Sequence, residues 1–130
     1  MITGFYAGIL ILLYIYLSFR VIMIRGAQKI SLGHGGFEPL NIALRVHGNF
    51  SEYVPMGLIL LALLELNGTT PWVLYTLGAV LVLGRVLHIS AFYNPAHLSL
   101  PRRVAGMILT LSCLLISGLY LITEFVMASL

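Results

Sequence analysis

The chain has 130 residues, of which 60% are hydrophobic and only 8% are charged, and its formal net charge is +3. Soluble domains carry about 25% charged residues, so this composition indicates an integral membrane protein and not a soluble domain. The few Lys and Arg residues form no basic block, which argues against nucleic acid binding.

The first apolar run is long enough to cross a hydrocarbon core, which needs ~20 helical residues. It lacks a basic leader and a small-residue cleavage site, so we expect a retained membrane span instead of a signal peptide. Arg20 and Arg25 mark its far end. The glycine-rich segment 26–37 follows as a predicted loop. His34 within it has no cysteine or second histidine nearby, and we expect no metal site.

The second apolar segment contains the main polar feature of the chain. Arg45, Asn49 and Glu52 stand at i, i+4 and i+7 and therefore form one stripe on a helix. Arg45 and Glu52 are about 10 Å apart along the axis, at roughly 1.5 Å per residue, too far to neutralise each other. A charge buried in a membrane helix costs at least about 2.5 kcal/mol on insertion scales. The stripe therefore predicts a ligand site, the alternative being a polar cluster that links helices.

Two prolines and a predicted N-cap residue affect the shape and the start of the second and third helices. Pro55 in the second helix predicts a kink, whereas Pro71 suits the first position of the third helix. Thr70 is the predicted N-cap of that helix, and Trp72 fits the aromatic belt at a membrane interface. The predicted helices span about residues 2–24, 38–66, 71–92 and 102–127. They form one all-α domain, an integral membrane four-helix bundle over residues 1–130.

Other polar residues lie near the helix ends. Arg85 and His88 stand one turn apart in the third helix, either in the same site as the stripe or paired with Glu52 for packing. Arg102 and Arg103 open the fourth helix, where they serve orientation or catalysis. Cys113 cannot form an intrachain disulfide and is predicted to be a small buried hydrophobe. The residues predicted to be solvated or interfacial are His34, Glu38, Glu65, His97 and Glu124.

Basic residues gather beside two of the three loops. Arg20, Arg25 and Lys29 flank the first loop, and Arg102 and Arg103 flank the third. By the positive-inside rule, both basic loops lie in the cytoplasm and both termini lie outside it. The stripe and the third-helix pair then fall in the same leaflet, which predicts a single site that faces the cytoplasm.

The predicted site has an excess of positive charge. Arg25, Arg45, Arg85 and Arg103 are four cations against the one carboxylate of Glu52. Such a set suits an anionic ligand with several carboxylates, because guanidinium groups bind carboxylates through paired hydrogen bonds. The lone Glu52 suits an ammonium group on the same ligand.

These residues also carry a resemblance to a known family. The run Arg-x-His-x-Asn-x-x-Glu-Tyr-x-Pro at 45–55 is similar to the second-helix signature of the MAPEG family, the membrane-associated proteins of eicosanoid and glutathione metabolism. Gly-Arg-Val-x-His at 84–88 and Pro-x-Arg at 101–103 extend the resemblance over nearly the full chain. The short length and the Gly-Gly-Phe before the second helix resemble the bacterial members, which implies a bacterial inner membrane.

The resemblance implies a homotrimer with glutathione bound between neighbouring subunits on the cytoplasmic side. The implied activity is that of a glutathione transferase or peroxidase, whose thiolate attacks lipophilic electrophiles that arrive from the bilayer. Arg103 matches the arginine that stabilises this thiolate, and a guanidinium at a helix N-terminus favours a thiolate on physical grounds as well. The residues implied to bind glutathione are Arg25, Arg45, His47, Asn49, Glu52, Tyr53, Arg85, His88 and Tyr93.

Two departures from the family pattern support an alternative. Family enzymes commonly carry a tyrosine where this chain has Phe92, so that hydroxyl is lost or comes from Tyr93. Arg102 adjoins Arg103, and either could face the thiol. The alternative is a non-catalytic membrane protein of the same fold that binds glutathione or lipid. A proton-coupled exporter of four helices would need a carboxylate, typically in its first helix, which has none. The apolar residues do not specify the second substrate.

Overall fold

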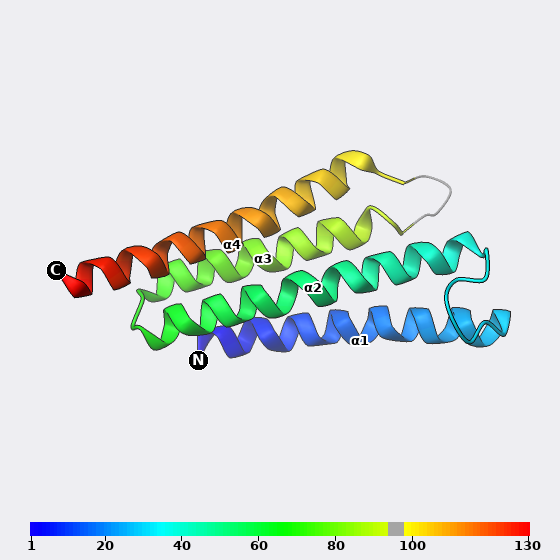
Figure 1. Ribbon diagram of the computed structural model, residues 1–130, viewed down its shortest axis with the longest axis horizontal. Coiled ribbons are helices and arrows are strands. Elements are labelled where there is room, and N and C mark those ends of the chain that lie inside the picture. The colour runs from blue at the N-terminus through cyan, green and yellow to red at the C-terminus, as the bar shows by residue number, and fades with distance from the viewer. Residues whose placement is uncertain (94–97) are drawn as a thin grey trace.

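A computed structural model describes residues 1–93 and 98–130 of the protein, and this part of the chain contains four helices and no strand. Each helix is long and apolar enough to cross a membrane. The all-α membrane four-helix bundle expected from the sequence is therefore confirmed. The helices are α1 (Ile2–Gln28), α2 (Glu38–Leu66), α3 (Pro71–Ser90) and α4 (Leu100–Ser129) (Figure 1).

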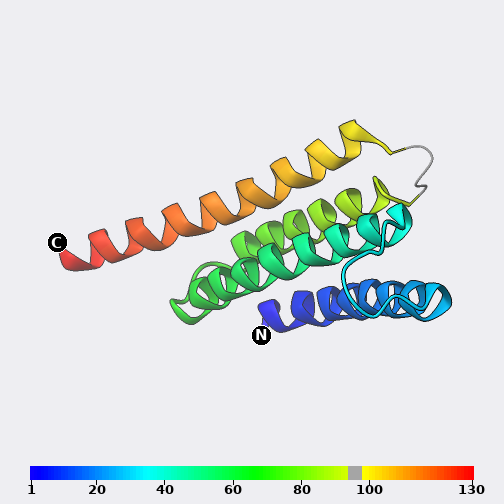
Figure 2. The ribbon, with the colours of Figure 1, turned by 45° about the vertical axis from the view of Figure 1, so that its right-hand side comes forward.

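The four helices run alternately up and down, so both termini lie at one end of the bundle (Figure 1). The C-terminal ends of α1 and α3 and the N-terminal ends of α2 and α4 lie together at the other end. α1 packs on α2 and α3, and α4 packs on α3 and α2, with no packing between α1 and α4 among the described residues. Figure 2 shows α1 and α4 on opposite sides of the α2–α3 pair. The central pair thus contributes residues to both sides of the bundle.

Some helix ends differ from the predicted ones for local reasons. α1 continues past Arg25 until Lys29 takes a left-handed conformation with φ 54° and closes the helix. α2 runs through Pro55 without interruption. α3 begins at Pro71 with Thr70 as its N-cap residue, as predicted, although the side chain of Thr70 makes no capping hydrogen bond. α4 begins at Leu100, before its predicted start.

Two carboxylates predicted to be solvated instead hold the terminal end of the bundle together. Glu65, at the end of α2, accepts hydrogen bonds from the first two backbone N–H groups of α1. Glu124 of α4 accepts from the side chains of Asn67 and Thr69 in the turn between α2 and α3. Helix ends leave N–H groups without partners inside the helix, and here a distant carboxylate supplies the acceptor.

α3 and α4 approach so closely that their backbones touch. A Cβ atom on Gly106 would lie 2.6 Å from the backbone N of His88 and 2.7 Å from the carbonyl O of Gly84. A side chain at Gly84 would in turn meet the Oγ1 of Thr110 at 2.8 Å. Small residues at membrane helix interfaces allow such contact. The contact brings Thr110 of α4 beside the polar residues at the end of α3.

Cys113 lies in the same interface between α3 and α4. Its side chain is 0% exposed, and its Sγ donates a hydrogen bond to the carbonyl of Leu77 at 3.3 Å. The prediction of a small buried residue is confirmed, with a weak hydrogen bond in addition to its packing.

Candidate functional site

The polar stripe of α2 lies on a face of the helix that the rest of the chain leaves open. Arg45, Asn49 and Glu52 line a shallow groove of about 460 Å³ together with Asn41. Arg45 and Glu52 are exposed, whereas Asn49 is half-buried. Within the described residues, neither charged side chain forms an ion pair. Charged groups on the open face of a membrane span need a partner from outside the chain.

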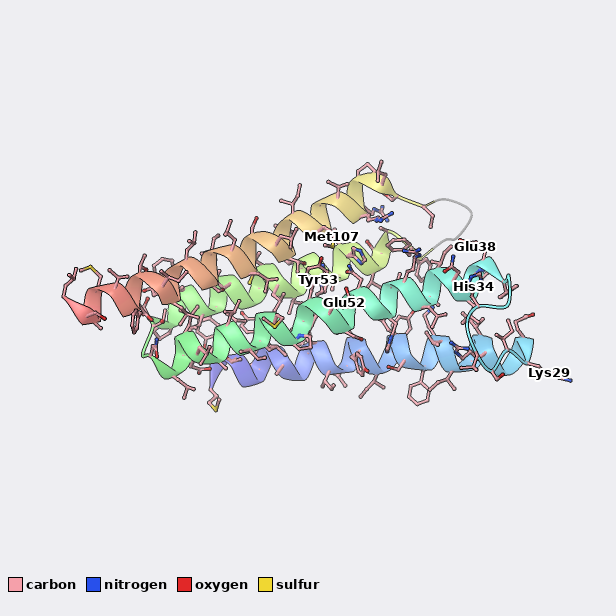
Figure 3. The ribbon with its side chains drawn as sticks, viewed as in Figure 1. Lys29, His34, Glu38, Glu52, Tyr53 and Met107 are labelled. Atoms are coloured by element: carbon pink, nitrogen blue, oxygen red, sulfur yellow. The ribbon has the colours of Figure 1, made fainter. Side chains whose placement is uncertain are left out.

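Arg85 of α3 lies behind this stripe, in the interior of the bundle. It is 1% exposed, and its Nη1 donates a hydrogen bond of 2.8 Å to the Oδ1 of Asn49. Its Nη2 donates to the hydroxyl of Thr110 and lies 3.6 Å from the Sδ of Met107. The guanidinium also stands 5.7 Å from the centre of the Tyr53 ring. Tyr53 of α2 and Met107 of α4, both labelled in Figure 3, thus each lie beside this guanidinium.

The hydrogen bonds and the ring contact that Arg85 makes in the described residues are all with neutral groups. In the described part of the chain, neither Arg85 nor His88 forms a salt bridge with Glu52, so the predicted packing alternative is wrong. The Nε of Arg85 is buried and has no hydrogen-bond partner among the same residues. Enclosing a charge without a counter-ion is costly, so the guanidinium depends on the few acceptors it has.

His88 and Arg103 meet at Phe92. The ring of His88, which is 5% exposed, lies 5.3 Å from the ring of Phe92, and the Arg103 guanidinium stands 5.7 Å from the centre of that ring. Arg103 is thus the arginine that packs on the end of α3, although Arg102 and Arg103 are both exposed. Tyr93 is 79% exposed. The aromatic position next to His88 and Arg103 therefore carries no hydroxyl group.

Two predicted ligand residues face elsewhere in the chain. His47 stands roughly 200° around the helix from Arg45, since α-helices have 3.6 residues per turn. Its Nε2 lies 3.0 Å from the hydroxyl of Ser18 on α1, and its ring lies 5.0 Å from that of Tyr14. Arg25 donates to the carbonyl of Ile30, at 3.3 Å, in its own loop. The structure therefore does not bring His47 together with the stripe.

An apolar groove of about 600 Å³ lies between α1 and α2. Tyr14, which contacts His47, forms part of its wall together with Leu10, Phe50 and Val54. α2 therefore carries a polar groove formed by its stripe and an apolar groove shared with α1.

Thr110 is the site residue that the sequence analysis missed. It is 0% exposed and contacts both Arg85 and the backbone of Gly106. One signal was available, because Thr110 stands at i+7 from Arg103 and therefore on the same face of α4. Threonine is common in membrane helices, so this spacing alone could not single it out.

Of the remaining histidines, the structure describes only His34. His34 is exposed, and its Nδ1 accepts a hydrogen bond from the backbone of Gly36 at 3.2 Å. No group of three His, Cys, Asp or Glu side chains suited to a metal occurs among residues 1–93 and 98–130. His97 lies outside the described residues, as does the segment 94–97 around it.

The fold and this arrangement define a class, that of small multi-pass membrane proteins with a polar stripe on the second helix and a basic residue at the start of the fourth. The model of the MAPEG family matches residues 3–123, and the chain belongs to this family. It is 36% identical, over 94 residues and 72% of each chain, to "Inner membrane protein YecN" of Escherichia coli strain K12. The same values hold for that protein of E. coli O6:H1. No solved structure matches the chain significantly.

Proposed function

We propose that the protein is an inner-membrane enzyme that binds glutathione and uses its thiolate against lipophilic electrophiles, as a transferase or a peroxidase. The observation that carries the proposal is the open groove of α2, where Arg45, Asn49 and Glu52 form no ion pair within the described chain. Family membership and the name of the E. coli relative support the membrane and the location.

The charges of the groove suit glutathione. This tripeptide carries two carboxylates and one ammonium group. Arg45 can bind a carboxylate with paired hydrogen bonds, and the Glu52 carboxylate can accept from the ammonium. Their fixed separation along α2 favours a ligand that carries both charges at a distance from each other. A simple anion would leave Glu52 unsatisfied.

The distribution of the predicted ligand residues supports a site between subunits. His47 faces α1, whereas Arg45, Asn49 and Glu52 face the opposite side of α2. A small ligand that touches both sets must lie between two copies of the chain. A homotrimer, as expected for this family, would provide such an interface three times.

The proposed chemistry is nucleophilic attack by sulfur. Arg103 would hold the thiolate of the bound tripeptide, since a nearby guanidinium favours the anion over the thiol. In conjugation the sulfur forms a bond to an electrophilic carbon, and the leaving group departs with its electron pair. The lipophilic partner would enter from the bilayer, where it concentrates.

A second candidate function is binding without turnover. It is favoured by the packing of Arg103 over the ring of Phe92, where family enzymes commonly have a tyrosine, and by the exposure of Tyr93. With its guanidinium held on an apolar ring and no hydroxyl beside it, the site would bind glutathione or lipid and present it unchanged.

The decisive experiment measures binding and turnover separately. Glutathione is titrated calorimetrically into the detergent-solubilised protein, with Glu52→Gln expected to weaken binding. Turnover is followed with 1-chloro-2,4-dinitrobenzene, together with the ultraviolet absorbance of the thiolate. Arg103→Ala should abolish both signals, and Arg102→Ala should retain most of each. Binding without either signal in the unaltered protein would support the second candidate. No glutathione binding would refute the first candidate and the glutathione form of the second.

We also propose that the basic loops face the cytoplasm and that both termini lie outside it. The first loop connects α1 to α2, and the helix ends on either side of the third loop belong to α3 and α4. All four of these helix ends lie at the same end of the bundle (Figure 1). Alkaline phosphatase fused to the C-terminus should be active, and green fluorescent protein fused there should be dark. The reverse pattern would overturn this orientation.

A further inference from the structure

The orientation of the Asn49 amide is fixed by the chemistry of its neighbour. An asparagine side chain has one end that accepts hydrogen bonds and one end that donates them, and the two are similar in shape. A guanidinium has only donors, so the end of Asn49 that meets Arg85 at 2.8 Å must be its Oδ1. Among the described residues Asn49 makes its side-chain hydrogen bond through the Oδ1 and none through the Nδ2, and Asn49 lines the groove.

Arg85 is itself held by a hydroxyl whose hydrogen is already in use. Thr110 donates to the carbonyl of Gly106 at 2.8 Å, which leaves an oxygen lone pair to accept from Arg85. Thr110 is fully buried against the close α3–α4 contact, so it has little freedom to turn. Every role in the group Gly106, Thr110, Arg85 and Asn49 is therefore fixed. Thr110 donates to Gly106, and Arg85 donates both to Thr110 and to the Oδ1 of Asn49, which leaves the N–H₂ of Asn49 free.

We propose that Arg85 and Thr110 are positioning residues that lock the Asn49 amide with its N–H₂ towards the groove. The groove then offers donors at Arg45 and Asn49 and an acceptor at Glu52. It therefore selects a ligand with a carboxylate or carbonyl beside Arg45 and Asn49 and a cation beside Glu52. This inference rests on the proposed function and deepens it, since it assigns the polarity of the site.

The lock changes the role of Arg85 implied by the family resemblance. At 1% exposure, Arg85 acts through Asn49 and not by contact with the ligand. Its positive charge stands directly behind the amide, where it polarises the N–H₂ donors and attracts an anion in the groove. A bound carboxylate would thus supply part of the counter-charge that the interior of the bundle lacks.

The first test replaces the donor by an acceptor of the same shape. In Asn49→Asp the new carboxylate can still accept from Arg85, so the thermal unfolding temperature should stay the same or rise. Glutathione binding should weaken by at least about tenfold, because a lost donor and a repelling oxygen now face the ligand. Binding within twofold of the unaltered protein would overturn the proposal. A protein that fails to fold would also contradict it.

The second test acts at a distance from the groove. Thr110→Val removes the acceptor of Arg85 at nearly the same volume, whereas Thr110→Ser keeps it. We expect several-fold weaker glutathione binding for Val and near-normal binding for Ser. Equal binding by the two variants would refute the lock.

A readout without ligand separates this inference from the proposed function. In protein labelled with ¹⁵N-asparagine, the side-chain amide resonance of Asn49 is assigned by its loss in Asn49→Asp. It should shift or broaden in Thr110→Val and stay in place in Thr110→Ser. If the unaltered protein binds no glutathione, the proposed function fails, and this resonance alone decides the lock. An unchanged resonance in both variants would disprove it.

Discussion

At the scale of single residues, the charged side chains of this membrane protein lie in two kinds of environment. Arg85 is enclosed, and its donors are met by neutral acceptors within the chain. Arg45 and Glu52 are left on an open face, with no ion pair among the described residues. Apart from its buried Nε, Arg85 finds its hydrogen-bond partners within one subunit. Arg45 and Glu52 do not find an ion-pair partner there, which is why we place the ligand and the subunit contact at these two residues.

A first prediction concerns Glu65, whose two carboxylate oxygens accept from the first two N–H groups of α1. Glu65→Gln removes one acceptor and the negative charge that a helix N-terminus favours. We expect a lower thermal unfolding temperature, measured by circular dichroism in detergent. Glu38→Gln is the matched control. Glu38 is also a negative charge in the first turn of a helix, but it is exposed, and among the described residues its side chain accepts only from Asn41 of its own helix. Equal decreases for both variants would contradict the capping role.

The spacing of residues in the sequence was sufficient to predict the stripe of α2. It was insufficient to predict which residues of other helices lie next to the stripe. The spacing of Arg45, Asn49 and Glu52 requires one face on any helix, and the structure confirms that they share a groove. Which residue of another helix lies behind that face depends on how the helices approach each other. The contacts of Arg85 with Thr110 and of Arg103 with Phe92 could therefore not be read from spacing.

At the scale of elements, the contact between α3 and α4 brings two backbones together, and the sequence did not predict it. The four spans followed from their length and apolar character, which local composition determines. Helix pairing depends on the shapes of both surfaces, and glycines such as Gly84 and Gly106 are common in all membrane helices. Their position opposite each other appears only in three dimensions.

A second prediction follows from this contact. In Gly106→Ala, the added Cβ would meet backbone atoms of α3 at 2.6 and 2.7 Å, so the helices must separate. We expect destabilisation by about 1–3 kcal/mol, as is typical of overpacking, measured by denaturant unfolding in mixed micelles.

Gly118→Ala on the same helix is the control for this prediction, because a Cβ there meets nothing within 4 Å. It should be neutral or stabilising by up to about 1 kcal/mol, since alanine favours helices over glycine. Similar losses in the two variants would contradict the role of the α3–α4 contact.

At the scale of the whole molecule, the bundle presents different chemistry on its two sides. α1 covers the side of α2 that carries His47, and the opposite face of α2 exposes the stripe. Such a molecule is suited to a cyclic assembly, in which one side of each copy meets the other side of the next. The number of functional sites then equals the number of contacts between copies.

A third prediction tests whether sites form between copies. Glu52→Gln disables the stripe, and a second chain with Arg25→Ala and His47→Ala disables the α1 side. Each variant alone should bind glutathione weakly. When the two are co-expressed in equal amounts and assemble at random, about a quarter of the contacts should pair two intact sides and bind normally. Calorimetry gives this fraction.

The two possible arrangements give different numbers in this mixture. A site made within one chain would leave no intact site at all. A mixture of the unaltered chain with a chain carrying all three substitutions is the control, with about a quarter of the sites intact for a shared site and about half for a site within one chain.

The buried Cys113 has a practical consequence for all these measurements. The chain has one cysteine, and its sulfur is sealed between two helices and turned to a backbone carbonyl. Under native conditions, colorimetric disulfide reagents and maleimides should therefore report only on sulfur that the assay itself supplies. Conversely, a cysteine engineered at any exposed position would be the single labelled point on the molecule, ready to carry a spin label or a dye without further substitutions.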